Sequence, residues 1–181
     1  MIPNTPDPDL EWFTYCFEDT QQGDYDLNDV VIKATRLNET TVEYRIVACG
    51  AHDEIYIKDL NCGAITDNAE VHGLFGQEPS TFINTDGSDF GVVVATKTVD
   101  ENFSFLKAET QPWIKDGTTG AEMRLAGIGE TPHGVLIPTD FKYPKEKTHI
   151  YDAYPKFIDW GFNGDENAIL WYSEPVPSKV R

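Results

Sequence analysis

Basic residues are scarce in this chain of 181 residues: 14 lysines and arginines stand against 31 aspartates and glutamates, and the formal net charge is −17. A nucleic-acid-binding surface needs clustered positive charge, so this composition excludes nucleic acid as a partner. An anionic membrane surface is disfavoured for the same reason. A shell of this sign attracts cations, and it neither favours nor excludes neutral ligands such as sugars.

Long apolar runs and catalytic motifs are also missing. No 18 consecutive residues are apolar, so we expect no direct membrane insertion. The sequence holds no Gly-x-Ser-x-Gly motif, no His-Glu-x-x-His pair and no glycine-rich phosphate loop. A glycoside-acting enzyme is an alternative because acidic residues are abundant, but it needs two carboxylates at a fixed separation in a cleft. We therefore expect that the protein is not an enzyme.

Cysteine is sparse as well. Cys16, Cys49 and Cys62 have no Cys-x-x-Cys spacing, which disfavours a zinc site. At most one disulfide can form within the chain, and Cys49 and Cys62 are the pair closer in sequence. Buried free thiols are the simpler interpretation.

Length and composition indicate one folded domain. Hydrophobic residues make up 40% of the chain, and its aromatic residues are 4 Trp, 8 Tyr and 10 Phe, enough to build a packed core. Residues 1–10 are rich in proline and polar residues, and we expect a linker there, at the edge of a domain that spans residues 11–181. No signal peptide is evident, and we expect that a longer parent protein carries any such signal upstream.

Short segments of β-type residues dominate the pattern. Val42, Tyr44 and Ile46 alternate with Glu43 and Arg45, as in a half-buried strand. Similar segments, with glycine, asparagine and proline between them, predict roughly ten strands: 11–17, 29–37, 41–49, 54–58, 71–75, 81–84, 92–98, 103–108, 122–126, 135–137 and 169–172. The prediction is an all-β fold, a two-sheet antiparallel β-sandwich of jelly-roll type.

One short helix is predicted near the C-terminus. Apolar residues recur at helical spacing between positions 150 and 158. Asp152 is a favourable N-cap, Pro155 then falls in the first turn, and Gly161 lies where a C-terminal cap belongs. The aromatic residues of this segment are expected to face the core.

An acidic stretch between two apolar runs holds the candidate site. The alternation Asp24-x-Asp26-x-Asn28 places oxygen ligands on every second residue, as at the start of short calcium loops. An EF-hand would continue with glycine at its sixth position and glutamate at its twelfth, where this chain has Asp29 and Thr35. The residues after Asp29 read as a strand. We therefore expect a calcium loop between two strands.

The predicted metal ligands are all oxygen donors of this stretch. Asp24, Asp26, Asn28 and Asp29 are expected to bind calcium directly, and Glu18 and Asp19 to complete or brace the shell. The alternative is a metal-free acidic hairpin held by Asx-turn hydrogen bonds. Two further acidic turns, 84–89 and 163–167, are alternative sources of ligands for such a site.

Two groups of motifs stand near the two ends of the domain: Phe17-Glu18-Asp19 with 23–31 near the start, and Tyr143-Pro144-Lys145-Glu146, Ile150, 152–160 and Trp171-Tyr172 near the end. In these motifs the chain resembles the LruC domain, a bacterial domain of unknown function found mainly on secreted or surface proteins of Bacteroidetes. Residues 113–138 follow the family's central pattern only loosely. The resemblance implies an extracellular or cell-surface location and no established activity.

Taken together, the sequence predicts a non-catalytic, calcium-binding structural or interaction module of a secreted or cell-surface bacterial protein. A polysaccharide or another surface protein is the expected partner. The alternative is a carbohydrate-binding or adhesive module, in which some of Trp12, Trp113, Trp160 and Trp171 supply a sugar-stacking surface. Exposed coplanar rings on one sheet face would distinguish it.

Overall fold

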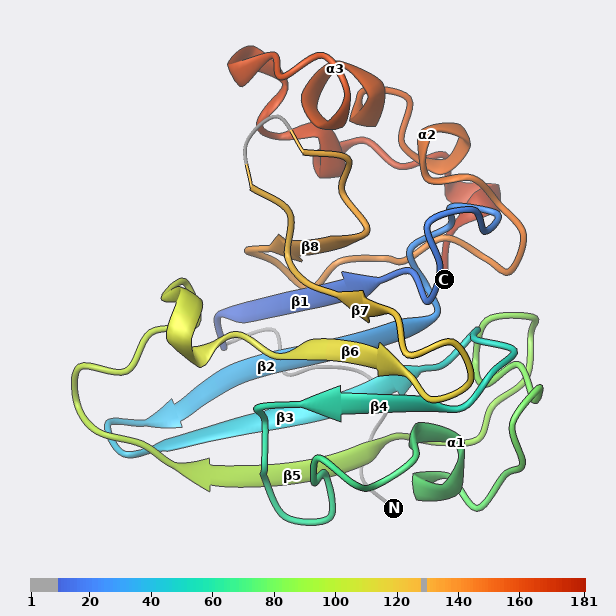
Figure 1. Cartoon of the computed structure of the whole chain (residues 1–181). Helices are drawn as coiled ribbons and strands as arrows, with labels where there is room; N and C mark the ends of the chain where they lie inside the picture. The colour runs from blue at the N-terminus through green and yellow to red at the C-terminus, as the bar shows by residue number, and fades with distance from the viewer. Residues whose placement is uncertain (1–9, 128–129) are drawn as a thin grey trace.

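The computed structural model describes residues 10–127 and 130–181, and among these residues most of the regular structure is strand. One group of antiparallel strands comprises β1 (Trp12–Phe17), β2 (Val30–Asn38), β3 (Thr41–Ala48), β5 (Val93–Thr98) and β8 (Gly134–Ile137). A second comprises β4 (Ile55–Lys58), β6 (Trp113–Asp116) and β7 (Glu122–Met123). They form two sheets, in the orders β5-β3-β2-β1-β8 and β4-β6-β7 (Figure 1). The predicted two-sheet antiparallel sandwich is confirmed; the predicted linker, apart from Leu10, lies outside the described residues.

Both faces of the larger sheet are buried at β1 and over most of β2, because successive residues of a strand point to opposite sides and each side is covered there. Tyr15 and Phe17 of β1 face the smaller sheet and share a core with Ile57 of β4 and Ile114 of β6. Cys16, between them, points the other way into a second core. The near-continuous burial of β1 and β2 follows from this two-sided packing.

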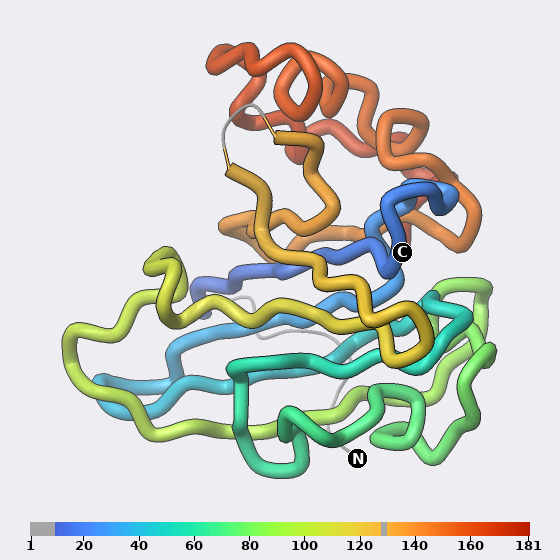
Figure 2. Tube along the Cα trace, in the orientation of Figure 1, coloured from blue at the N-terminus to red at the C-terminus, as the bar shows by residue number. Residues whose placement is uncertain are grey.

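The second core lies beneath the C-terminal segment. That segment carries α2 (Ile150–Ala153), α3 (Phe157–Gly161) and the 3₁₀ turns η2 (Glu166–Ala168), η3 (Trp171–Ser173) and η4 (Pro177–Lys179). In Figures 1 and 2 it lies, in orange and red, over the side of the sheet where β1 and β8 are paired. Phe141, Tyr154 and Trp171 pack against one another there, with ring centroids 4.8 to 5.5 Å apart.

The single predicted C-terminal helix is in fact two short helices. Pro155 disfavours helical geometry in the residue before it, and Tyr154 accordingly has φ −135° and ψ 85°. Asp152 therefore lies inside α2, which begins after His149, and Gly161 ends α3. None of the helices in the described ranges is long and apolar enough to cross a membrane.

Several predicted strands are not strands. Residues 71–75 contain α1 (Val71–Leu74), because the Glu70 carboxylate accepts hydrogen bonds from the Gly73 amide at 2.8 Å and the His72 ring at 2.6 Å. Residues 103–107 form turns and Ala108 begins η1 (Ala108–Thr110), while the Phe105 side chain is buried in the first core. Segments 81–84 and 169–172 are also irregular, apart from a bridge at Ile83 and the start of η3.

The three cysteines are buried free thiols. Cys49 and Cys62 belong to the first core and Cys16 to the second. Burial raises the pKa of each thiol, so these groups act as small apolar core residues.

Candidate metal centre

The acidic loop between β1 and β2 has an unusual backbone. Tyr25 and Leu27 lie in the left-handed region, with φ of 54° and 56°. Such a conformation costs a non-glycine residue about 1 to 2 kcal/mol. The two residues alternate with Asp24, Asp26 and Asn28, and the Leu27 side chain is anchored in the second core. The loop is thereby bent so that its polar side chains come together.

Three carboxylates converge at this loop. Asp24, Asp26 and Glu146 each place an oxygen so that the three atoms lie within 4.8 Å of one another. Two oxygens bound to one calcium ion at about 2.3 to 2.6 Å are separated by no more than about 5 Å, so the spacing suits a shared ion. Asp26 is fully buried, and Asp24 and Glu146 are half-buried.

Asn28 adds a fourth oxygen beside this group. Its Nδ2 donates to the carbonyl of Pro144 at 3.2 Å, which fixes the orientation of the amide, while its buried Oδ1 has no hydrogen-bond partner in the described structure. A Cβ built on Gly50 would lie 2.1 Å from Asn28 Oδ1 and 3.0 Å from Glu146 Oε2, so both oxygens surround one point. An amide oxygen and a carboxylate oxygen repel one another unless a proton or a cation lies between them.

Glu18 is fully buried behind the loop. One carboxylate oxygen accepts the Leu27 amide hydrogen, and the other has no partner among the described residues. Burial, reinforced by Asp24 and Asp19, raises the pKa of Glu18 to about 8. Burial, with Glu18, Asp24 and Glu146 nearby, raises the pKa of Asp26 to about 9.

Asp19 and Asp29 form a separate pair. The Asp29 carboxylate accepts the Asp19 backbone N–H at 2.7 Å, and neither residue belongs to the group of three. Burial raises the pKa of both carboxyls. The structure thus brings Asp24, Asp26 and Asn28 together as predicted, places Glu18 behind them, and puts Asp19 and Asp29 to one side.

No lysine, arginine or histidine within residues 10–127 and 130–181 forms an ion pair with any of these carboxylates. Buried carboxylates without a cationic partner are strongly unfavourable as anions. They must either bind protons, as the raised pKa values indicate, or share a bound cation.

Glu146 was not among the ligands expected from the sequence. It lies far along the chain, and its only signal was its place in the Tyr143–Glu146 motif that carries the family resemblance. Its Oε2 also accepts the Thr85 hydroxyl at 2.6 Å. The acidic turn 84–89 therefore does reach the site, through a hydroxyl rather than a carboxylate.

The loop is tied to the C-terminal segment by hydrogen bonds on both sides of Asp26. Asp26 Oδ2 accepts the Lys147 amide hydrogen at 2.8 Å, and the Tyr25 carbonyl accepts that of Ile150 at 2.8 Å. The Tyr25 ring meets the ring of Phe157 with centroids 6.1 Å apart. The candidate centre thus lies at the junction between the β1–β2 loop and the segment that covers the second core.

Comparison with known proteins gives one match. Residues 125–172 match the model of a family described as Domain of unknown function (DUF4842). No curated protein and no solved structure matches the chain. The matched stretch contains Glu146 and the C-terminal helices, whereas the acidic loop precedes it. In its C-terminal part, the chain is similar to a family whose function is not known.

Proposed function

We propose that the chain is a non-catalytic, calcium-binding structural or interaction module of a secreted or cell-surface bacterial protein. The single observation that carries the calcium proposal is the convergence of Asp24, Asp26 and Glu146, with the unpartnered Asn28 Oδ1 beside Glu146. All four groups are hard oxygen donors, the kind that calcium prefers. Glu18 adds negative charge behind them.

Calcium suits this site better than magnesium. Calcium accepts six to eight oxygens in flexible geometry, and carboxylates bind it through one or both oxygens. Magnesium needs a near-ideal octahedron at about 2.0 to 2.1 Å and gives up its waters reluctantly, which favours exposed sites with fewer protein ligands. A site that is largely buried and rich in carboxylates favours the larger ion.

The ion would act by joining two parts of the fold. Asp24, Asp26 and Asn28 come from the β1–β2 loop, and Glu146 comes from the start of the C-terminal segment. Binding would neutralise mutually repelling carboxylates and hold the strained loop in place, so that metal binding contributes to folding. This is a structural role, without a reaction.

Two parts of this proposal, the bacterial origin and the location outside the cell or at its surface, depend on the resemblance to the LruC domain. That resemblance suggests a bacterial protein at the cell surface or outside the cell, where millimolar calcium and weak sites are usual for extracellular modules. A polysaccharide or another surface protein remains the proposed class of partner. The tryptophans support a protein partner more than a sugar platform, because Trp12 and Trp171 are buried and Arg124 covers Trp113 at 4.0 Å.

Thermal unfolding tests the proposal, with melts in EDTA, in calcium and in magnesium. A calcium concentration of one hundred times the dissociation constant would stabilise the fold by about 2.7 kcal/mol. For a domain of this size, the midpoint would rise by about 5 to 10 °C. Asp24→Asn combined with Glu146→Gln should abolish the rise. The control, Glu101→Gln with Glu109→Gln, makes the same change in charge at two exposed positions and should keep it.

The absence of a calcium response, or a calcium response that survives in the Asp24→Asn, Glu146→Gln variant, would reject calcium binding at this site, and the metal-free acidic hairpin would then be the better description. An equal response to magnesium would reject the preference for calcium.

A further inference from the structure

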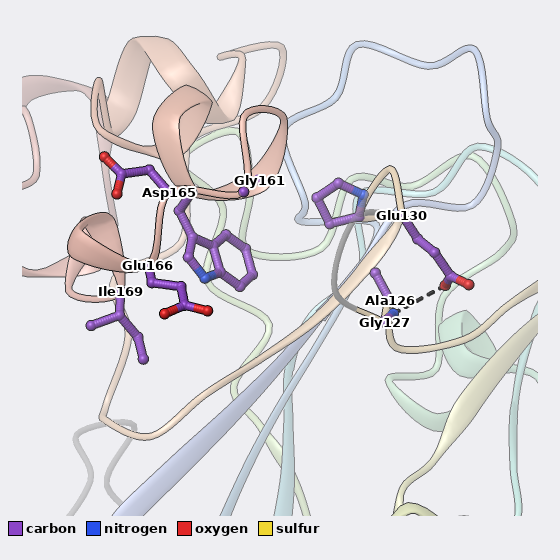
Figure 3. Close-up of a pocket in the computed structure, with 10 residues that line it drawn as sticks. Ala126, Gly127, Glu130, Gly161, Asp165, Glu166 and Ile169 are labelled. Atoms are coloured by element: carbon purple, nitrogen blue, oxygen red, sulfur yellow. Dashed lines mark hydrogen bonds between the residues drawn. The ribbon is translucent and has the colours of Figure 1, made fainter.

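A second candidate site lies in the C-terminal part of the chain. A cavity of about 460 Å³ is lined on one side by Ala126, Gly127, Glu130 and Pro132 and on the other by residues of α3 and η2 (Figure 3). This volume lies within the range of small-ligand pockets, about 300 to 1,000 Å³. The residues that line it all fall inside the family match at 125–172, and the acidic loop contributes none of them.

Every ionisable side chain that lines the cavity is a carboxylate: Glu130, Asp165 and Glu166. In Figure 3 Glu130 lies on one side of the cavity and Asp165 and Glu166 lie on the other. The Glu166 carboxylate lies beside the cavity, whereas the carboxylates of Glu130 and Asp165 point away from it. One oxygen of Glu130 accepts the Gly127 amide hydrogen, and one oxygen of Asp165 caps η2. The second oxygen of each, and the whole Glu166 carboxylate, have no hydrogen-bond partner in the described structure. A ligand in this cavity would be flanked by negative charge on two sides.

The rest of the lining is mainly apolar. Trp160, Pro132 and Ile169 contribute its larger apolar side chains. Trp160 is held by stacking on the buried Trp171, with ring centroids 5.5 Å apart and an interplanar angle of 28°. Its indole is therefore a fixed aromatic wall. A tryptophan face attracts a cation more strongly than any other aromatic ring.

Apolar side chains also gather on the surface around this segment. Seven large apolar residues are exposed in the described ranges, and four of them lie between positions 158 and 170: Ile158, Phe162, Ile169 and Leu170. Ile169 lines the cavity itself. Concentrated exposed apolar residues mark surfaces that bind other proteins.

We propose that this cavity binds a lysine or arginine side chain presented by a partner protein. The aliphatic stem would lie along Pro132 and Ile169, and the cationic group would lie against the Trp160 ring beside the Glu166 carboxylate, with Glu130 and Asp165 adding negative charge around the cavity. The surrounding apolar residues would contact the backbone and neighbours of the inserted residue. This inference deepens the interaction role proposed above and rests on it, but it does not depend on the calcium site.

A neutral sugar fits the lining less well. Carboxylates only accept hydrogen bonds at neutral pH, and among the lining side chains the indole N–H of Trp160 is the one donor. A sugar hydroxyl both donates and accepts, so a sugar-binding site usually offers both kinds of group. Negative charge around the cavity instead favours a positively charged ligand that donates hydrogen bonds.

Three capped tripeptides test the inference: acetyl-Gly-Arg-Gly-amide, its lysine counterpart, and a citrulline analogue with the shape of arginine but no charge. Binding is followed through the ¹⁵N–¹H signal of the Trp160 indole. We expect the arginine and lysine peptides to bind at least 10-fold more tightly than the citrulline peptide. Glu130→Gln with Glu166→Gln should remove this preference, whereas Glu101→Gln with Glu109→Gln should keep it.

Equal binding of the citrulline peptide would overturn the inference, as would an equal loss of binding in the two double variants, which would show only diffuse attraction to an acidic protein. A shift of the Trp160 signal by cellohexaose but not by the basic peptides would overturn it in favour of a sugar site. Each titration is run in calcium and in EDTA. Peptide binding in both media without a calcium response in the melts would reject the metal site alone, and the converse result would reject the cavity alone.

Discussion

The hydroxyl of Tyr25 donates a hydrogen bond of 2.7 Å to the carbonyl oxygen of Pro132. Tyr25 stands between Asp24 and Asp26 of the candidate calcium site, and Pro132 lines the cavity of the C-terminal part. One side chain therefore connects the two candidate sites. The connection is made by a residue whose own backbone is in the left-handed region.

Replacing Tyr25 by phenylalanine removes this hydrogen bond and keeps the ring contacts with Phe157 and Phe162. We expect a loss of about 1 kcal/mol, because a net hydrogen bond contributes about that much. The melting midpoint should fall by about 2 to 4 °C. Tyr56→Phe is the control, since the Tyr56 hydroxyl bonds only an exposed carboxylate, Glu54, at 3.2 Å. An unchanged midpoint for Tyr25→Phe would mean that the connection does not stabilise the fold.

Gly50→Ala should disrupt the proposed calcium site although Gly50 is not itself a ligand. The added Cβ would lie 2.1 Å from Asn28 Oδ1, so the amide must leave its position or the backbone must shift. We expect the stabilisation by calcium to fall by more than half in thermal melts. Gly73→Ala provides the control, because its Cβ would meet its nearest neighbour at an ordinary 3.6 Å. A full calcium response in Gly50→Ala would show that Asn28 is not a ligand.

The stability of the calcium-free protein should fall as the pH rises. Glu18 and Asp26 have pKa values raised to about 8 and about 9, against about 4 in an unfolded chain. Between these limits the folded state binds more protons than the unfolded state, so the free energy of unfolding decreases with pH. Calcium competes with those protons, and its stabilising effect should therefore grow over the same range.

Melts between pH 5.5 and 8, in EDTA and in calcium, measure both effects. The difference between the wild type and Asp26→Asn separates the contribution of the site from that of every other group in the protein. A stability that rises with pH in EDTA, relative to Asp26→Asn, would show that the buried carboxyls are ionised without a metal.

Calcium should also slow the exchange of particular backbone amides. Lys147 donates its amide hydrogen to Asp26 Oδ2, and Ile150 donates to the Tyr25 carbonyl. Both bonds break when the loop leaves the C-terminal segment. We expect calcium to protect these two amides more than that of Val99, which donates to the Thr40 carbonyl at 2.9 Å next to the far edge strand β5. Equal protection at all three positions would indicate general stabilisation rather than a joint between the loop and the segment.

The fold was predictable where the sequence has a clear two-residue period. The predicted segments 41–49 and 54–58 correspond closely to β3 and β4, since apolar and polar residues alternate along both. The segment 71–75 has β-type residues but forms a helix, because Glu70 caps it. The segment 103–108 is rich in apolar residues because Phe105 is buried in the core and Phe103 packs against it. A turn can place these side chains there as well as a strand can.

Only the ligands that lie close together in the sequence were predictable. The spacing of Asp24, Asp26 and Asn28 is visible in the sequence, and the structure brings their oxygens together. Glu146 comes from a distant segment, and its position depends on how that segment packs over the second core. Asp19 and Asp29 belong to the same acidic stretch, but the Asp29 carboxylate accepts the Asp19 amide hydrogen, and neither residue joins the group of three carboxylates. No local pattern distinguishes these cases.

The most direct test of the calcium site is a crystal structure grown in millimolar calcium, with anomalous scattering recorded at long wavelength. The proposal predicts an anomalous peak about 2.3 to 2.6 Å from oxygens of Asp24, Asp26, Asn28 and Glu146. A structure without such a peak, in which Asp24 and Glu146 turn apart into solvent, would contradict it.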